Sequence, residues 1–172
     1  DGEDTISVPS AVATAWAAEL AGVSAVEVLG ISDALAGDLD LVTVFPGGID
    51  LTCTAGIAAG GHTIAALSGT TVTLEAATAG ADAINIAGDG LADTIDLDVQ
   101  GNIAVSLTLG GVEVAGLLAD TGAITIGSLV MTPSDPAGPA IGTSTLTITG
   151  DQDVTLTAST IQTIDGQAME GD

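Results

Sequence analysis

Between Thr94 and Leu118, apolar residues fall at every second position, which is the period of a β-strand with one buried face. Ile95 and Leu97 point to one side of the first strand, and the residues between and around them are polar. Gly-Asn at 101–102 and Gly-Gly at 110–111 accept the positive φ angles of two-residue hairpin turns. We therefore predict an antiparallel meander of three strands. Its middle strand places four apolar residues on one face: Ile103, Val105, Leu107 and Leu109.

Short segments of similar pattern recur along the chain, separated by turns rich in Gly, Pro and Asp. Three further hairpins are predicted, over residues 39–54, 62–75 and 145–157. One helix is predicted before them, over the alanine-rich segment 10–21, which follows a proline. Its large apolar residues, Val12, Trp16 and Leu20, are four positions apart and so share one helix face. Trp16 is expected to anchor this helix on a sheet or, alternatively, to lie in a subunit interface.

About ten or more short strands with one N-terminal helix predict a mainly β protein. An antiparallel sandwich or jelly roll is preferred, with a β-solenoid as the alternative, because a strict solenoid would show a fixed repeat and the recurrence here is loose. We predict a main domain over residues 1–132, which contains the helix, and a proline-rich loop over 133–139. A C-terminal hairpin unit with a tail, residues 140–172, is expected to pack on the same domain.

The charge balance excludes several kinds of partner. The chain has 23 Asp and Glu residues and no Lys or Arg, so its formal net charge is -23. Nucleic acids and anionic membrane surfaces bind through cationic side chains and are therefore not expected. No apolar run approaches the ~18 residues of a membrane span, which predicts no membrane insertion.

The residues that build active sites are scarce as well. With one Trp, one Phe and no Tyr or Arg, the chain lacks the side chains that usually shape pockets. His62 has no second His and no neighbouring Cys, and no G-x-S-x-G motif is present, so neither a zinc site nor a hydrolase is expected. Cys53 falls on the apolar side of its strand, which predicts a buried, inert thiol, with an intermolecular disulfide as the alternative. We predict that the protein is not an enzyme.

The segment 88–93, GDGLAD, resembles the Gly-Asp-rich turns of secreted calcium-binding repeats of the RTX kind. This resemblance implies that Asp89 and Asp93 bind calcium, and Asp96 and Asp98 downstream extend the candidate set. Carboxylates that approach one another without Lys or Arg need protonation, screening or a hard cation. The alternative is that these aspartates only occupy turns and a wet face. Three other acidic clusters are open as sites: Asp1, Glu3 and Asp4; Asp38 and Asp40; Asp151 and Asp153.

Unprotected strand edges predict self-association. Lysine, which commonly guards a sheet edge against another strand, is absent, and the outer faces carry mostly Thr, Ser and Ala. We therefore expect copies of the chain to assemble through edge pairing and donated strands. Assembly should strengthen at acidic pH or with divalent cations, because like charges face one another. The candidate interface residues are Thr5, Ile6, Val8, Trp16, Thr145, Thr147, Thr155 and Thr157.

The composition as a whole, without basic residues and rich in Thr, Gly and small side chains, resembles that of bacterial secreted surface-layer and extracellular appendage proteins. The resemblance implies an extracellular or cell-surface location and a structural subunit of a filament, tube or surface lattice. The alternative is a calcium-stiffened adhesin or spacer domain of a larger secreted protein. The start at Asp1, without Met, predicts processing or trimming of the chain.

Overall fold

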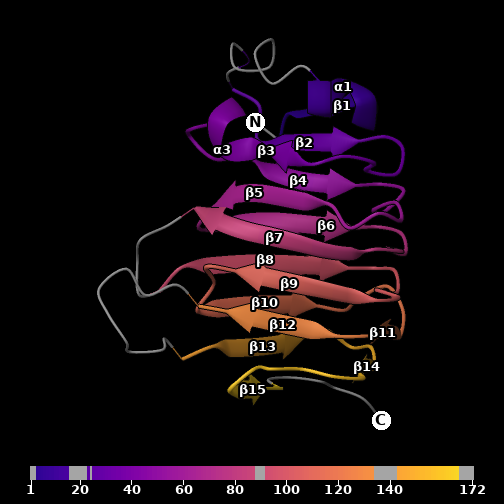
Figure 1. Ribbon diagram of the computed structural model, residues 1–172, viewed down its shortest axis with the longest axis vertical. Coiled ribbons are helices and arrows are strands. Elements are labelled where there is room, and N and C mark those ends of the chain that lie inside the picture. Colours follow the sequence, from indigo (N-terminus) through magenta and orange to yellow (C-terminus); the bar gives the residue numbers. More distant parts are fainter. Residues whose placement is uncertain (1–2, 16–22, 24, 88–91, 134–142, 167–172) are drawn as a thin grey trace.

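The computed structural model describes residues 3–15, 23, 25–87, 92–133 and 143–166 (Figure 1). Its strands form parallel sheets that stack as a β-solenoid of about 5 turns. The fold is therefore mainly β, as predicted. Its architecture is the β-solenoid, which was the alternative to the preferred sandwich or jelly roll. The prediction of an antiparallel sandwich or jelly roll was wrong, because every strand pairing in the described residues is parallel.

Two sheets face each other across the core, and their strands run in opposite directions (Figure 1). The first, called the long sheet here, consists of β1 (Thr5–Val8), β2 (Val28–Ile31), β4 (Asp50–Cys53), β6 (Thr70–Leu74), β8 (Thr94–Val99), β10 (Val114–Leu118), β13 (Thr145–Thr149) and β15 (Thr163–Asp165). The second, the five-stranded sheet, consists of β3 (Leu39–Asp40), β5 (Thr63–Leu67), β7 (Ala81–Ala87), β9 (Ser106–Gly110) and β12 (Leu129–Thr132).

A third, narrow side connects the two sheets. It contains the short pair β11 (Ile124–Ile126) and β14 (Val154–Leu156), together with single bridges such as Leu35–Ile57 and Thr78–Ile103. Each coil thus runs along the long sheet, crosses the narrow side and returns along the five-stranded sheet. Equivalent positions stack in register from coil to coil. One buried column of the long sheet contains Leu29, Leu51, Val72, Leu97, Leu117 and Ile148.

The predicted meander over residues 94–118 is divided between the two sheets. β8 and β10 are parallel neighbours in the long sheet, whereas β9, which lies between them in sequence, belongs to the five-stranded sheet. Gly101 is not part of a hairpin turn. A Cβ atom at this position would collide with the backbone of Ala76 and Ala77 in the preceding coil, so the residue is glycine because the corners stack closely.

The other predicted hairpins were wrong for the same reason, since consecutive strands belong to different sides of the solenoid. β5 and β6 lie in opposite sheets, and β13 and β14 lie in the long sheet and on the narrow side. Residues Leu41–Val44, predicted as part of a strand, form the short helix α3. Asp40 caps this helix by accepting hydrogen bonds from the Thr43 hydroxyl (2.7 Å) and the Thr43 N–H (3.0 Å), which lower the pKa of its carboxyl.

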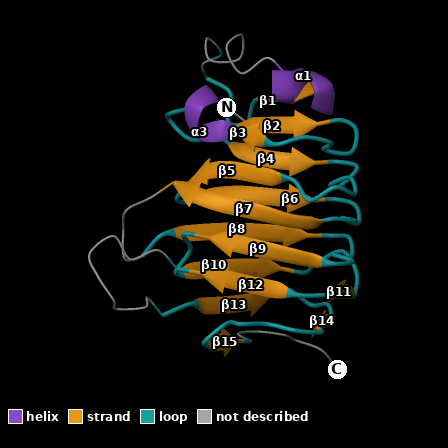
Figure 2. Cartoon of the chain, viewed as in Figure 1, coloured by secondary structure: helices purple, strands orange, loops and turns teal. Residues whose placement is uncertain are grey.

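Helices lie at the N-terminal end of the stack (Figure 2). Of the helix predicted over 10–21, residues Ser10–Ala15 form α1, and Trp16 lies outside the described residues. Buried Ser10 connects α1 to the next coil, because its N–H donates to Asp33 and its Oγ accepts the N–H of Ala36 at 2.8 Å. α1 contacts β3 and so covers this end of the five-stranded sheet.

The C-terminal strands continue the same stack. β13 lies between β10 and β15 in the long sheet. Ala115 pairs with Leu146 across a chain segment that contains the proline-rich loop, whereas Ile95 pairs with Ala115 after a much shorter one. Of the loop predicted over residues 133–139, only Pro133 lies within the described residues.

Candidate assembly surfaces

The C-terminal end of the solenoid leaves part of its core open among the described residues. Among the described strands, β14 pairs only with β11, and β15 pairs only with β13. Ile164 occupies the core position that stacks on Leu146, yet 47% of Ile164 is exposed, against 0% of Leu146. Val154 and Leu156 of β14 are likewise only partly buried. This end therefore presents apolar side chains beside β15, the last described strand of the long sheet.

The N-terminal end is different. Its core is closed, because Leu29, Leu35 and Leu39 are fully or almost fully buried and α1 lies over β3. β1, in contrast, is paired only with β2 among the described strands, so one backbone edge is open. Ile6 and Val8 of β1 are half-buried against the core. Each end of the long sheet therefore has an edge strand among the described strands, β1 at the N-terminal end and β15 at the C-terminal end. The core is covered at the N-terminal end and partly exposed at the C-terminal end.

The predicted interface residues fall into three groups. Thr5, Ile6 and Val8 lie on the open edge strand β1, and Thr155 and Thr157 are exposed in β14 and directly after it. β13 is paired on both sides, so the idea that its backbone edge is open was wrong. Thr145 and Thr147 lie on β13. Trp16 lies outside the described residues.

The two sheets also differ in the charge of their outer faces. The outer face of the long sheet carries Asp50, Asp96, Asp98 and Asp165. In β5, β7, β9 and β12 no outward residue is charged, because the single acid of these strands, Asp82, points into the core. The fifth strand, β3, lies at the N-terminal edge of the sheet and carries the exposed Asp40 beside Ala65, so it is not part of this surface. We call this surface the neutral face. It consists of Thr63, Ala65, Leu67, Ala81, Ala83, Asn85, Ala87, Ser106, Thr108, Gly110, Val130 and Thr132.

Corner carboxylates connect consecutive coils. Each accepts a hydrogen bond from the backbone N–H of a residue in a neighbouring coil, at 2.7 to 2.9 Å, and such charge-assisted bonds need no cationic side chain. Part of the acidity of the chain is therefore structural. The acceptors are Glu27, Asp38, Asp50, Asp82 and Glu113, and the donors are Asp4, Thr63, Thr71, His62 and Asp93 respectively.

The predicted calcium residues do not converge in the described part of the chain. Asp96 and Asp98 lie on the outer face of β8, where Asp98 accepts a hydrogen bond from the Gln100 side chain at 3.0 Å. Asp93 is buried at the start of the same strand, about 16 Å from Asp98 along an extended chain. Asp89 lies outside the described residues. No three His, Cys, Asp or Glu side chains among the described residues are placed to hold a metal ion, and calcium binding stays a prediction.

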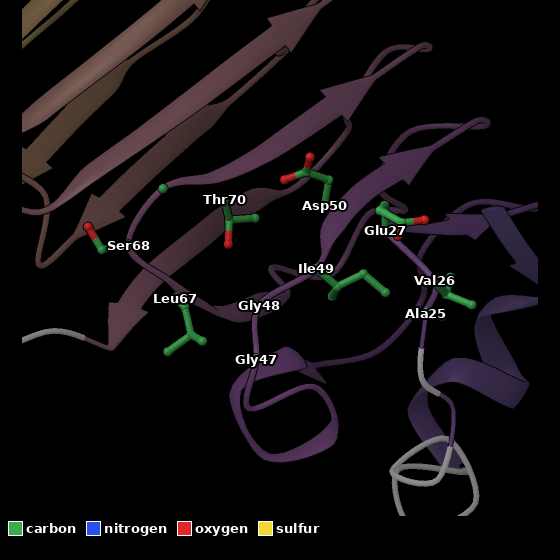
Figure 3. Close-up of a pocket in the computed structure, with 11 residues that line it drawn as sticks. Ala25, Val26, Glu27, Gly47, Gly48, Ile49, Asp50, Leu67, Ser68 and Thr70 are labelled. Atoms are coloured by element: carbon green, nitrogen blue, oxygen red, sulfur yellow. The ribbon is translucent and has the colours of Figure 1, made fainter. Parts of the chain in front are cut away.

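An open cavity of about 520 Å³ lies at the corner where the chain returns to the long sheet (Figure 3). Glu27, Asp50, Ser68 and Thr70 line it together with glycines and aliphatic residues. The two carboxylates and the Ser68 hydroxyl already accept hydrogen bonds from backbone N–H groups. These side chains therefore have a structural role that accounts for their position. Without any Lys or Arg in the chain, this cavity has no side chain that attracts an anionic ligand.

A small polar group lies inside the core near the narrow side. Thr78 and Asp82 are each 2% exposed, at positions where the adjacent coils have Ile103 and Leu107. In the part of the chain that the structure describes, Thr78 Oγ1, Asp82 Oδ2 and His62 Nε2 have no hydrogen-bond partner. Burial raises the pKa of the Cys53 thiol to about 12, and the charge of Asp82 adds to this effect.

Cys53 is buried and free, as the alternation predicted. We expect the native thiol to react with a soluble disulfide reagent at pH 8 at least about 100-fold more slowly than the unfolded chain, because the reactive thiolate is both rare and inaccessible. Timed labelling with and without denaturant measures this ratio. Equal rates in the two states would show that Cys53 is accessible and would favour the intermolecular disulfide.

The chain matches no protein-family model, no curated protein and no solved structure. None of the helices in the described residues is long and apolar enough to cross a membrane.

Proposed function

We propose that the protein is a structural subunit that self-assembles end to end into an extracellular filament, with a tube or surface lattice as wider forms of the same assembly. The observation that supports this most directly is the half-exposed Ile164 at a position that is fully buried one coil earlier. Repeat proteins that act as monomers usually cover such an end with a polar cap.

In the proposed contact, the C-terminal coil of one copy lies on the N-terminal coil of the next. β15 then pairs in parallel with β1, and the long sheet continues across the junction at the ~4.8 Å spacing of neighbouring strands. Ile164 and Leu156 become buried, and Ile6 and Val8 lie at the junction from the other side. Because this contact joins two different surfaces, it does not close on itself and produces an open filament.

The extracellular location is supported by the composition. A chain without Lys or Arg offers no cleavage site to proteases of trypsin type, which favours persistence outside a cell. The predicted stacking also fits the absence of lysine from the edge strands β1 and β15, where lysine would guard against further pairing.

Ile164→Asp tests the end contact. The variant places a carboxylate in the apolar part of the junction, so we expect the concentration needed for assembly to rise at least about tenfold. Val105→Asp is the matched control, because Val105 is 50% exposed at a corner away from both ends and gains the same charge. Sedimentation velocity over a range of concentrations measures both. A monomeric wild-type protein throughout, or an equal effect of the two variants, would contradict the proposal.

A rigid spacer domain in a larger secreted protein is the second candidate. β1 and β15 lie at opposite ends of the long sheet (Figure 1), so in a longer polypeptide the solenoid would act as a spacer along its length. In that case, the following chain segment would cover Ile164. This candidate predicts that the isolated chain stays monomeric.

A further inference from the structure

We propose that the neutral face is a second assembly contact, at which strands β5, β7, β9 and β12 of one copy pack face to face on the same strands of another copy. This inference rests on the proposed self-assembly for the identity of its partner. It involves a different surface from the end contact, and it predicts that filaments associate laterally in pairs.

The neutral face is flat because its outward side chains are short and stacked in register. One rank contains Thr63, Ala83, Thr108 and Val130, and the next contains Ala65, Asn85, Gly110 and Thr132. The longest polar side chain of the second rank does not stand out from the sheet. Asn85 lies across Gly110, where a Cβ atom would collide with its side-chain oxygen, and no residue other than glycine leaves this space.

Charge makes this face the most favourable place for two copies to meet. Each copy has a formal net charge of -23, so any contact that brings carboxylates together is opposed. Packed sheets lie about 10 Å apart, and therefore two neutral faces in contact keep the aspartates on the outer faces of the two long sheets about 30 Å apart. This separation is about three times the screening length of ~10 Å at 0.1 M salt. Contact between two long sheets would instead bring Asp96 and Asp98 of both copies to within about 10 Å.

The same distribution argues that the partner is another copy. A basic partner would find carboxylates only at the N-terminal border of the neutral face, where Asp38 and Asp40 lie beside Thr63 and Ala65, and would bind the more acidic long sheet or the corners instead. The neutral face is suited to pack against a surface that is equally flat, uncharged and composed of small residues. The same face of a second copy has these properties. A twofold contact of this kind is self-complementary and requires no second protein.

Thr108→Asp tests this contact, with Thr73→Asp as the matched control. Both threonines point outward from central strands and are partly exposed, but Thr73 lies on the long sheet beside Asp98. Both substitutions are made in the Ile164→Asp background, which removes the proposed end contact. Sedimentation equilibrium up to about 100 µM then measures the remaining association.

We expect Ile164→Asp alone to be dimeric, Thr108→Asp to raise the dimer dissociation constant at least about tenfold and Thr73→Asp to leave it within about twofold. Dimers in both the wild-type protein and Ile164→Asp that Thr108→Asp dissociates would support the neutral face while contradicting the end contact. Long wild-type assemblies with a monomeric Ile164→Asp would overturn the neutral-face proposal and leave the end contact intact. An equal effect of Thr108→Asp and Thr73→Asp would also overturn it.

Discussion

Replacing Gly56 with alanine is expected to lower the free energy of unfolding by about 4 kcal/mol, through backbone strain and overpacking together. Gly56 has a φ of 71°, a left-handed conformation that costs other residues free energy. A Cβ atom there would also lie 2.8 Å from the Ala76 carbonyl oxygen and closer still to that of Ala77, in the next coil. The clash exists only because the corners of consecutive coils stack on each other.

Gly48→Ala separates these two costs. Gly48 has a similar φ of 87°, but a Cβ atom there would meet nothing within 4 Å. The control should therefore lose only the conformational part, about 1–2 kcal/mol. Equilibrium unfolding in denaturant measures both variants against the wild-type protein. Equal losses for Gly56→Ala and Gly48→Ala would contradict the stacked corners.

Ile103→Ala is expected to destabilise the protein by about 3–4 kcal/mol, whereas Val105→Ala should change stability by less than about 0.5 kcal/mol. Ile103 is 1% exposed and lies in the core column of the narrow side, where its removal leaves a cavity. Val105 is only two residues further along the chain but is 50% exposed, because the chain turns a corner between them.

This pair distinguishes the solenoid from a simple strand over the same residues. In a continuous strand with alternating faces, Ile103 and Val105 would point to the same side and be buried together. Denaturant unfolding of the two alanine variants gives the comparison directly. Similar losses at both positions would indicate a strand without a corner and would contradict the fold described here.

The strands could be predicted from the sequence more fully than their pairing. Alternation correctly places Ile95, Leu97 and Val99 in the core, because a strand buries one face in any sheet. The same alternation occurs in parallel and antiparallel sheets, so it does not identify the neighbouring strand. For this reason the hairpin turn predicted at Gly-Asn 101–102 is wrong, and these residues form a corner between two sides of the solenoid.

The repeat of the solenoid was hidden by its irregular length. Ile95 pairs with Ala115 after a short stretch of chain, whereas Ala115 pairs with Leu146 after a longer one. The corner glycines were the better signal. Gly56, Gly101 and Gly127 each lie against the backbone of an adjacent coil, which is a requirement that no hairpin imposes.

The candidate assembly surfaces remain predictions, and the structure gives only the position of each residue. Thr5 and Thr155 lie on strands that pair on one side only among the described residues. Thr145 lies on a central strand instead. Whether a strand lies at an edge depends on the order of the strands in the sheet, and a local sequence pattern does not predict that order. Ile164 and the neutral face were missed, since each is visible only once the coils are stacked.

Negative-stain electron microscopy of the purified chain at micromolar concentration, with and without calcium, tests most directly whether the coil stack continues from one copy to the next. We expect unbranched filaments, single or paired side by side, from the wild-type protein and discrete particles no larger than dimers from Ile164→Asp, and aligned filaments should diffract at ~4.8 Å along their axis. Single particles of the wild-type protein in both conditions would contradict end-to-end assembly and favour the spacer domain.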